Sequence, residues 1–155
     1  MLSDKIKDAA RGYLMLKMPK DALTELQHLP VAERESSDSL DLYLAAQMMD
    51  EDWNTAADTG LRLCKSKPRK GHYFLHAAFC LHEIGDTNQA KQTLLSGPKE
   101  LLDAPLFHYN MACYLAALEN FQQAQHYLAK AIQLDASLRE TASTDPDLKC
   151  IVNTE

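Results

Sequence analysis

Histidine and cysteine side chains gather in one stretch of the chain, where they could bind a metal ion. His72 and His76 are four residues apart, so their imidazoles would share one face of a helix, as a metal-binding pair does. Cys80 continues that face. However, no further acidic or thiol ligand follows at a spacing typical of a metal site, and the chain has no HExxH motif. We therefore expect these residues to lie on a surface or in a groove, with no metal and no cofactor.

Nucleophilic catalysis is the next chemistry that the residues could support. A thiol such as Cys113 becomes a nucleophile only beside an activating base and a group that orients that base. Nothing in the sequence supplies an oxyanion-hole loop. The carboxylates of Asp50 and Asp52 fall at a predicted turn, where we expect them to be solvated. We therefore expect that the protein is not an enzyme and has no catalytic residue.

The composition is that of a folded helical domain rather than of a nucleic-acid or membrane protein. The 155 residues carry 25% charged and 46% hydrophobic side chains, which suits one domain over residues 1–155. The net charge of -6 argues against nucleic acid as the main partner. The first residues lack the long apolar run of a signal peptide, and the sequence has no apolar run long enough for membrane insertion and no CxxC pair. We expect a cytoplasmic protein with reduced cysteines.

Charge is unevenly distributed along the chain. Every charged residue from Asp38 to Asp58 is acidic, and every charged residue from Arg62 to Lys70 is basic. Acids early in a helix and bases late in it both complement the helix dipole. A basic patch for an acidic partner or a phosphate is the alternative interpretation of the second run.

Alanine recurs with a fixed period that defines the elements on which these residues lie. Ala22, Ala56, Ala90 and Ala124 are each 34 residues apart, and a period near 34 is typical of stacked helical hairpins. Small and apolar residues at helical spacing predict four helix pairs. The expected helices cover residues 3–16 and 20–29, 38–50 and 53–65, 69–84 and 87–95, and 105–118 and 121–134. Short segments at 137–142 and 146–151 are expected to cap the open end.

Within this pattern the chain resembles the tetratricopeptide repeat (TPR) family, in the manner of a small bacterial member. The fourth repeat carries the resemblance best, through Met111-Ala112, Leu115, Phe121, Ala124, Leu128 and Ala131. The resemblance implies an all-α, right-handed superhelical solenoid with repeats at about 3–36, 37–70, 71–104 and 105–138 and a cap at 139–155. It also implies close helix crossings at Ala10, Ala45, Ala78 and Ala112, opposite Ala22, Ala57, Ala90 and Ala124. The second repeat also fits one residue earlier, so its register is open.

The same resemblance implies that inner residues of the first helices line a groove for a peptide or helix of another protein. The expected partner-binding residues are Leu42, Tyr43, Met49, Leu75, His76, Phe79, His82, Tyr109, Asn110 and Cys113. Ala46 and Ala116 belong to the same wall, and the first repeat offers Lys7, Asp8 and Arg11. An apolar and aromatic wall of this kind suits an amphipathic helix or an extended apolar segment.

Several functions remain open for such a scaffold. TPR proteins that clamp acidic chaperone tails use Lys, Arg and Asn at set positions, but here only Asn110 and Lys7 fit, and His76 stands where Asn or Arg is expected. A chaperone of the type III secretion class, which holds apolar segments of exported proteins, is one alternative. A regulatory or assembly subunit of an enzyme complex is another, and a homodimer is compatible with either.

Overall fold

The computed structural model describes residues 1–152, and within them the chain is all-α, with no strand. The α-helices are α1 (Leu2–Met15), α2 (Pro19–Leu26), α3 (Val31–Arg34), α4 (Ser37–Met49), α5 (Trp53–Ser66), α6 (Gly71–Glu83), α7 (Thr87–Leu95), α8 (Pro105–Ala117), α9 (Phe121–Leu134), α10 (Leu138–Thr144) and α11 (Lys149–Val152). Two 3-10 helices, η1 (Lys99–Asp103) and η2 (Pro146–Leu148), lie in the connections.

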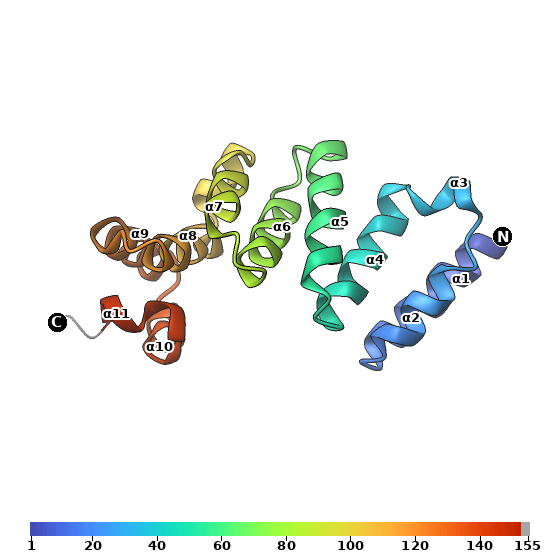
Figure 1. Cartoon of the computed structure of the whole chain (residues 1–155), viewed down its shortest axis with the longest axis horizontal. Helices are drawn as coiled ribbons and strands as arrows, with labels where there is room; N and C mark the ends of the chain where they lie inside the picture. The colour runs from blue at the N-terminus through green and yellow to red at the C-terminus, as the bar shows by residue number, and fades with distance from the viewer. Residues whose placement is uncertain (153–155) are drawn as a thin grey trace.

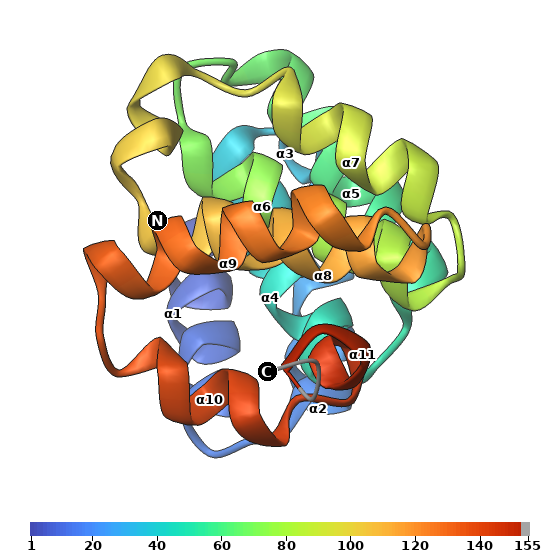
Figure 2. The ribbon, with the colours of Figure 1, turned by 90° about the vertical axis from the view of Figure 1, so that its left-hand side faces the viewer.

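Eight of these helices form four hairpins that follow one another along the long axis of the molecule (Figure 1). The hairpins are α1/α2, α4/α5, α6/α7 and α8/α9, and the helices of each hairpin contact those of the next. Figure 2 looks along this row from the C-terminal end, with α8 and α9 in front of the earlier hairpins. The predicted all-α repeat solenoid is therefore confirmed.

The turn inside each hairpin has the same conformation at the same interval. Lys17, Glu51, Gly85 and Glu119 have φ values of 61°, 58°, 88° and 62°, and each is 34 residues from the next. In each turn the following N–H donates to a carbonyl five residues earlier, as in Asn120 to Leu115 at 2.8 Å. This is the hydrogen-bond pattern of a Schellman helix end, which favours a left-handed residue at this position. All four repeats are thus in phase, and the register of the second repeat is fixed.

The alanines at the helix crossings behave as expected except in the second repeat. Ala45 is exposed, and Leu44, 2% exposed, occupies the buried place instead, so that prediction was wrong by one residue. Ala56 and Ala57 are both buried, which is why the sequence left two registers open. The other alanines predicted at crossings are almost completely buried: Ala10, Ala22, Ala78, Ala90, Ala112 and Ala124.

The second helices differ in length although the turns do not change their spacing. Helices α5 and α9 have 14 residues each, whereas α2 has 8 and α7 has 9. Helix α3 and 3-10 helix η1 occupy the remaining residues before the next hairpin begins. Pro30 and Pro98 precede these two short elements, and proline disfavours helix at the residue before it.

The buried side chains form two separate clusters. The smaller cluster joins α1 and α2 to one side of α4, through residues such as Leu26 and Ala46. The larger cluster runs from Leu40 on α4 through α5–α9 to Ile151 at the C-terminal end. The N-terminal hairpin therefore has its own small core.

Helices α10 and α11, with η2 between them, form the C-terminal cap. Leu148 and Ile151 are 0% and 3% exposed, and both belong to the larger cluster. They cover an apolar face at the end of the solenoid. Residues 153–155 of the expected cap lie outside the described residues.

Candidate partner-binding face

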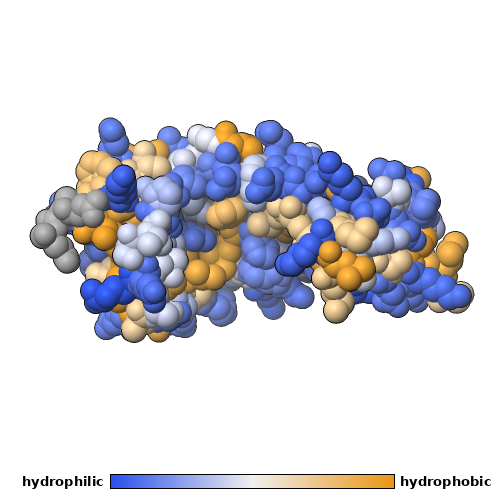
Figure 3. Space-filling view, turned by 90° about the horizontal axis from the view of Figure 1, so that it is seen from below, coloured by the Kyte–Doolittle hydropathy of each residue, from blue (hydrophilic) through white to orange (hydrophobic). Residues whose placement is uncertain are grey.

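The lower edge of the solenoid arches between α2 at one end and α10 at the other (Figure 1). Residues of the first helices that are 34 apart hold equivalent places on this side, because the turns are in phase. We call them the inner face: Asp38, Asp41, Ala45, Met48 and Met49 on α4; His72, Leu75, Phe79, His82 and Glu83 on α6; Leu106, Tyr109, Cys113, Ala116 and Ala117 on α8. Seen from below, hydrophobic patches with hydrophilic side chains between and around them lie on this side of the molecule (Figure 3).

The cap covers the part of the inner face that α8 provides. The hydroxyl of Tyr109 donates to Asp145 Oδ2 at 2.5 Å, and Cys113 Sγ lies 3.9 Å from the same oxygen. Burial, together with the Asp145 carboxylate, raises the pKa of both the Tyr109 hydroxyl and the Cys113 thiol. Both groups are therefore protonated at neutral pH and hold the cap in place.

His82 links the cap to α6. Its Nε2 lies 3.2 Å from Asp147 Oδ2, and its Nδ1 lies 2.9 Å from the Thr87 hydroxyl oxygen. The ring of Tyr114 packs beside it, with 5.0 Å between ring centroids. His82 is thus engaged within the molecule, together with Tyr109 and Cys113.

The middle of the inner face remains exposed and is apolar. Phe79 is 37% exposed and Met49 is 36% exposed. Trp53, at the start of α5, packs edge-on against Phe79 with ring centroids 5.5 Å apart. Leu75 is half-buried against the larger cluster, and His76 is exposed beside it on the same helix. The structure therefore brings together four of the residues expected to bind a partner, with Trp53 as an addition.

Leu42 and Tyr43 lie elsewhere. Leu42 is 7% exposed and belongs to the small N-terminal cluster. The hydroxyl of Tyr43 donates to the carbonyl of Leu26 at 3.1 Å, so this side chain packs against α2. Both follow the inner-face residue Asp41, and the residues of α4 that are equivalent to Leu75 and Phe79 are found by counting 34 residues back from α6. Asn110 is half-buried on α8, one residue after the inner-face position of Tyr109.

The two histidine rings on α6 lie close together. The rings of His72 and His76 are 6.1 Å apart between centroids. Burial and the neighbouring His72 lower the pKa of His76, against the opposing effect of Asp41. His76 therefore adds no permanent positive charge to the inner face at neutral pH.

One group of possible metal ligands occurs within residues 1–152. The ligand atoms of Cys113, Asp145 and Asp147 lie within 4.8 Å of one another. The two carboxylates already have structural roles, because Asp145 caps η2 and accepts from Tyr109. Asp147 faces His82. These hydrogen bonds explain the grouping without an ion.

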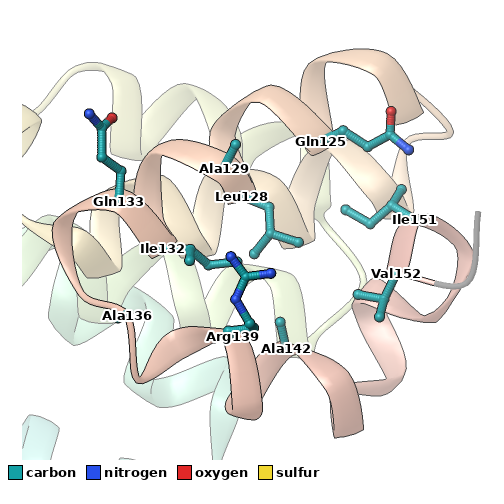
Figure 4. A pocket seen from close by; sticks show the side chains of 10 residues that line it. All are labelled: Gln125, Leu128, Ala129, Ile132, Gln133, Ala136, Arg139, Ala142, Ile151 and Val152. Atoms are coloured by element: carbon teal, nitrogen blue, oxygen red, sulfur yellow. The ribbon is translucent and has the colours of Figure 1, made fainter. Parts of the chain in front are cut away.

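A cavity lies at the end of the solenoid, away from the inner face. It has a volume of about 740 Å³ between α9, α10 and α11 (Figure 4). Leu128 and Ile132 from α9 face Ile151 and Val152 across it, and the Arg139 side chain extends from α10 toward Ile132. Within the solenoid, larger side chains hold the equivalent places on the first helices. His108 packs against Tyr127 of α9, with 5.9 Å between ring centroids, and Phe74 lies next to Gly97, just after α7. The residue 34 positions after His108 is the smaller Ala142 on α10.

The stacked hairpins and the equal spacing of their turns define a TPR-like solenoid. Solved structures with a similar fold agree with this assignment. PilF of Pseudomonas aeruginosa superposes with a TM-score of 0.77 at 16% identity, covering 97% of this chain and 68% of that one. MamA of Desulfovibrio magneticus RS-1, from residue 41 to its end, gives 0.79 at 16% identity, covering 97% and 89%. Both are TPR proteins. The chain matches no family model and no curated protein.

No helix in residues 1–152 has both the length and the apolar character needed to cross a membrane.

Proposed function

We propose that this protein is a scaffold that binds a segment of a partner protein on the exposed middle of its inner face. One observation carries the proposal: the inner face already holds a polypeptide segment, because the cap residues Asp145 and Asp147 contact it through Tyr109 and His82. The adjoining surface on α4 and α6 has the same orientation, carries the exposed apolar side chains of Met49 and Phe79, and has no covering segment among the described residues. Exposed aromatic side chains in such a place are typical anchors for a partner.

Phe79→Ala tests this proposal. Because Phe79 is more than one-third exposed, its truncation should change the melting temperature little while weakening capture of the partner from a lysate of the native organism, identified by mass spectrometry. Leu95→Ala is the matched control, since Leu95 is 53% exposed on α7, away from the inner face. Equal capture by Phe79→Ala and the unmodified chain would show that the partner binds elsewhere.

A second copy of the chain is one occupant that the experiment must distinguish. Sedimentation velocity of the purified protein measures self-association directly. A dimer that is lost in Phe79→Ala and kept in Leu95→Ala would identify the second copy as the partner on this face.

A further inference from the structure

The exposed apolar centre of the inner face is built from soft and aromatic side chains. Met48 and Met49 end α4, Trp53 begins α5, and Phe79 lies across from them on α6. Among these four side chains, Trp53 and Phe79 form a ring contact, with their ring centroids 5.5 Å apart. Methionine is flexible and polarizable, so it adapts to different apolar side chains. This centre therefore suits one or two large apolar anchors of a partner.

Carboxylates lie on the same helices as this apolar centre and in the turn that follows α4. Asp38 and Asp41 are exposed near the start of α4, and Glu83 is exposed at the end of α6. The turn that joins Met49 to Trp53 consists of three more acids: Asp50, Glu51 and Asp52. None of these six forms an ion pair with a basic side chain within residues 1–152. Asp52 also caps α5 by accepting from the Thr55 N–H, but no basic side chain of the described residues neutralises any of these carboxylates, so their negative charge remains on this surface.

The basic side chains that could neutralise this rim lie elsewhere. No lysine or arginine occurs from Asp38 to Asp58. Arg62 on α5 already pairs with Asp58 at 3.3 Å and with Glu35. The lowered pKa of His76 keeps that imidazole neutral near pH 7. The middle of the inner face is consequently anionic around an apolar centre.

We infer that the partner segment is basic and amphipathic, with lysine or arginine on both sides of a large apolar anchor. This inference rests on the proposed function and specifies its ligand. Opposite charges on the two surfaces would orient the segment and raise its association rate, while the apolar anchor would supply most of the affinity. An acidic segment would be repelled by the same rim.

Trp53 provides a built-in reporter for the test, because it is the only tryptophan of the chain and it contacts Phe79. The full chain is titrated with three peptides of equal length that lack tryptophan. One carries leucine and phenylalanine anchors between lysines, the second replaces the lysines by glutamates, and the third keeps the lysines but replaces the anchors by alanines. Trp53 emission and the anisotropy of a labelled peptide are both recorded.

We expect only the lysine peptide with anchors to bind and to change Trp53 emission, with affinity falling as salt rises. Asp38→Asn and Asp41→Asn should each weaken it about two- to fivefold, the range of one exposed ion pair. Glu100→Gln, an exposed carboxylate on η1, is the control and should leave affinity unchanged. Thermal unfolding of each variant checks that folding is intact.

Two outcomes would overturn the inference. Equal or tighter binding of the glutamate peptide would show that the rim does not select charge, while leaving the inner face as a peptide site. Absence of binding by all three peptides would also reject the basic segment as ligand. The proposed function is tested by a different experiment. It is wrong if Phe79→Ala captures the native partner as well as the unmodified chain does.

Discussion

The four turns inside the hairpins allow one backbone conformation to be tested with and without a Cβ atom. Gly85 occupies the left-handed conformation in the third hairpin, whereas Lys17, Glu51 and Glu119 occupy it in the others. Glycine adopts positive φ without steric cost, but an L-residue does not. We predict that each of these three residues changed to glycine stabilises the protein, and that Gly85→Ala destabilises it.

The magnitude follows from two opposing terms. Relief of the left-handed conformation is worth about 1–2 kcal/mol per residue. Glycine loses more freedom on folding, at a cost of about 0.5–1 kcal/mol. The net gain is therefore about 0.5–1 kcal/mol at each turn, and Gly85→Ala should lose a similar amount. The turns belong to different hairpins, so the triple variant should gain roughly 1.5–3 kcal/mol. A chain of this size gains about 2–4 °C in melting temperature per kcal/mol.

Urea and thermal unfolding followed by far-ultraviolet circular dichroism measure these changes. Glu51→Ala separates loss of charge from loss of Cβ, because it removes the carboxylate but keeps the strained conformation. Gly12→Ala is a second control. Gly12 lies inside α1 with open space around its Cα, so alanine there should stabilise by about 1 kcal/mol. The reasoning is refuted if Glu51→Gly is no more stable than Glu51→Ala, or if Gly85→Ala is as stable as the unmodified chain.

Three further predictions concern the core and the cap. Cys150 is exposed and should react quickly with a thiol reagent, whereas three buried thiols with raised pKa values should react only on unfolding: Cys64, Cys80 and Cys113. Gly60→Val should destabilise by roughly 1–3 kcal/mol in urea unfolding, because even a Cβ there would lie 3.0 Å from the Ala77 Cβ. Asp145→Ala should cost about 1–3 kcal/mol by leaving the buried Tyr109 hydroxyl without its acceptor. Adding Tyr109→Phe to that variant should recover part of the loss, and an unchanged melting temperature for Asp145→Ala would show that the cap does not depend on this bond.

The hairpins could be predicted because the alanines at helix crossings recur periodically in the sequence. The inner face could be predicted only in part. Ala45-Ala46 and Ala56-Ala57 are pairs of small residues, so alanine alone did not fix the register of α4. Among the four hairpin turns, only the third has glycine, Gly85, at the residue with positive φ. The other three turns have lysine or glutamate there, and these residue types do not indicate a positive φ in a sequence.

The contact between the cap and the inner face could not be predicted from the sequence. Asp145 and Tyr109 are 36 residues apart and belong to different kinds of segment, a capping turn and a repeat helix. Their hydrogen bond depends on how the chain bends after α10, where Pro146 ends the helical pattern. Tertiary placement of this kind is not encoded in a repeat period.

The constant spacing of the turns determines where the chain can gain or lose residues during evolution. One residue added inside α5 or α9 would rotate every later side chain by about 100° about the helix axis and move the next turn out of phase. The segments after α2 and α7 differ, because these helices end early and the short elements α3 and η1 with their connections complete the repeat. Insertions, deletions and engineered tags should therefore be tolerated at residues 27–36 and 96–104, and selected against within the long second helices.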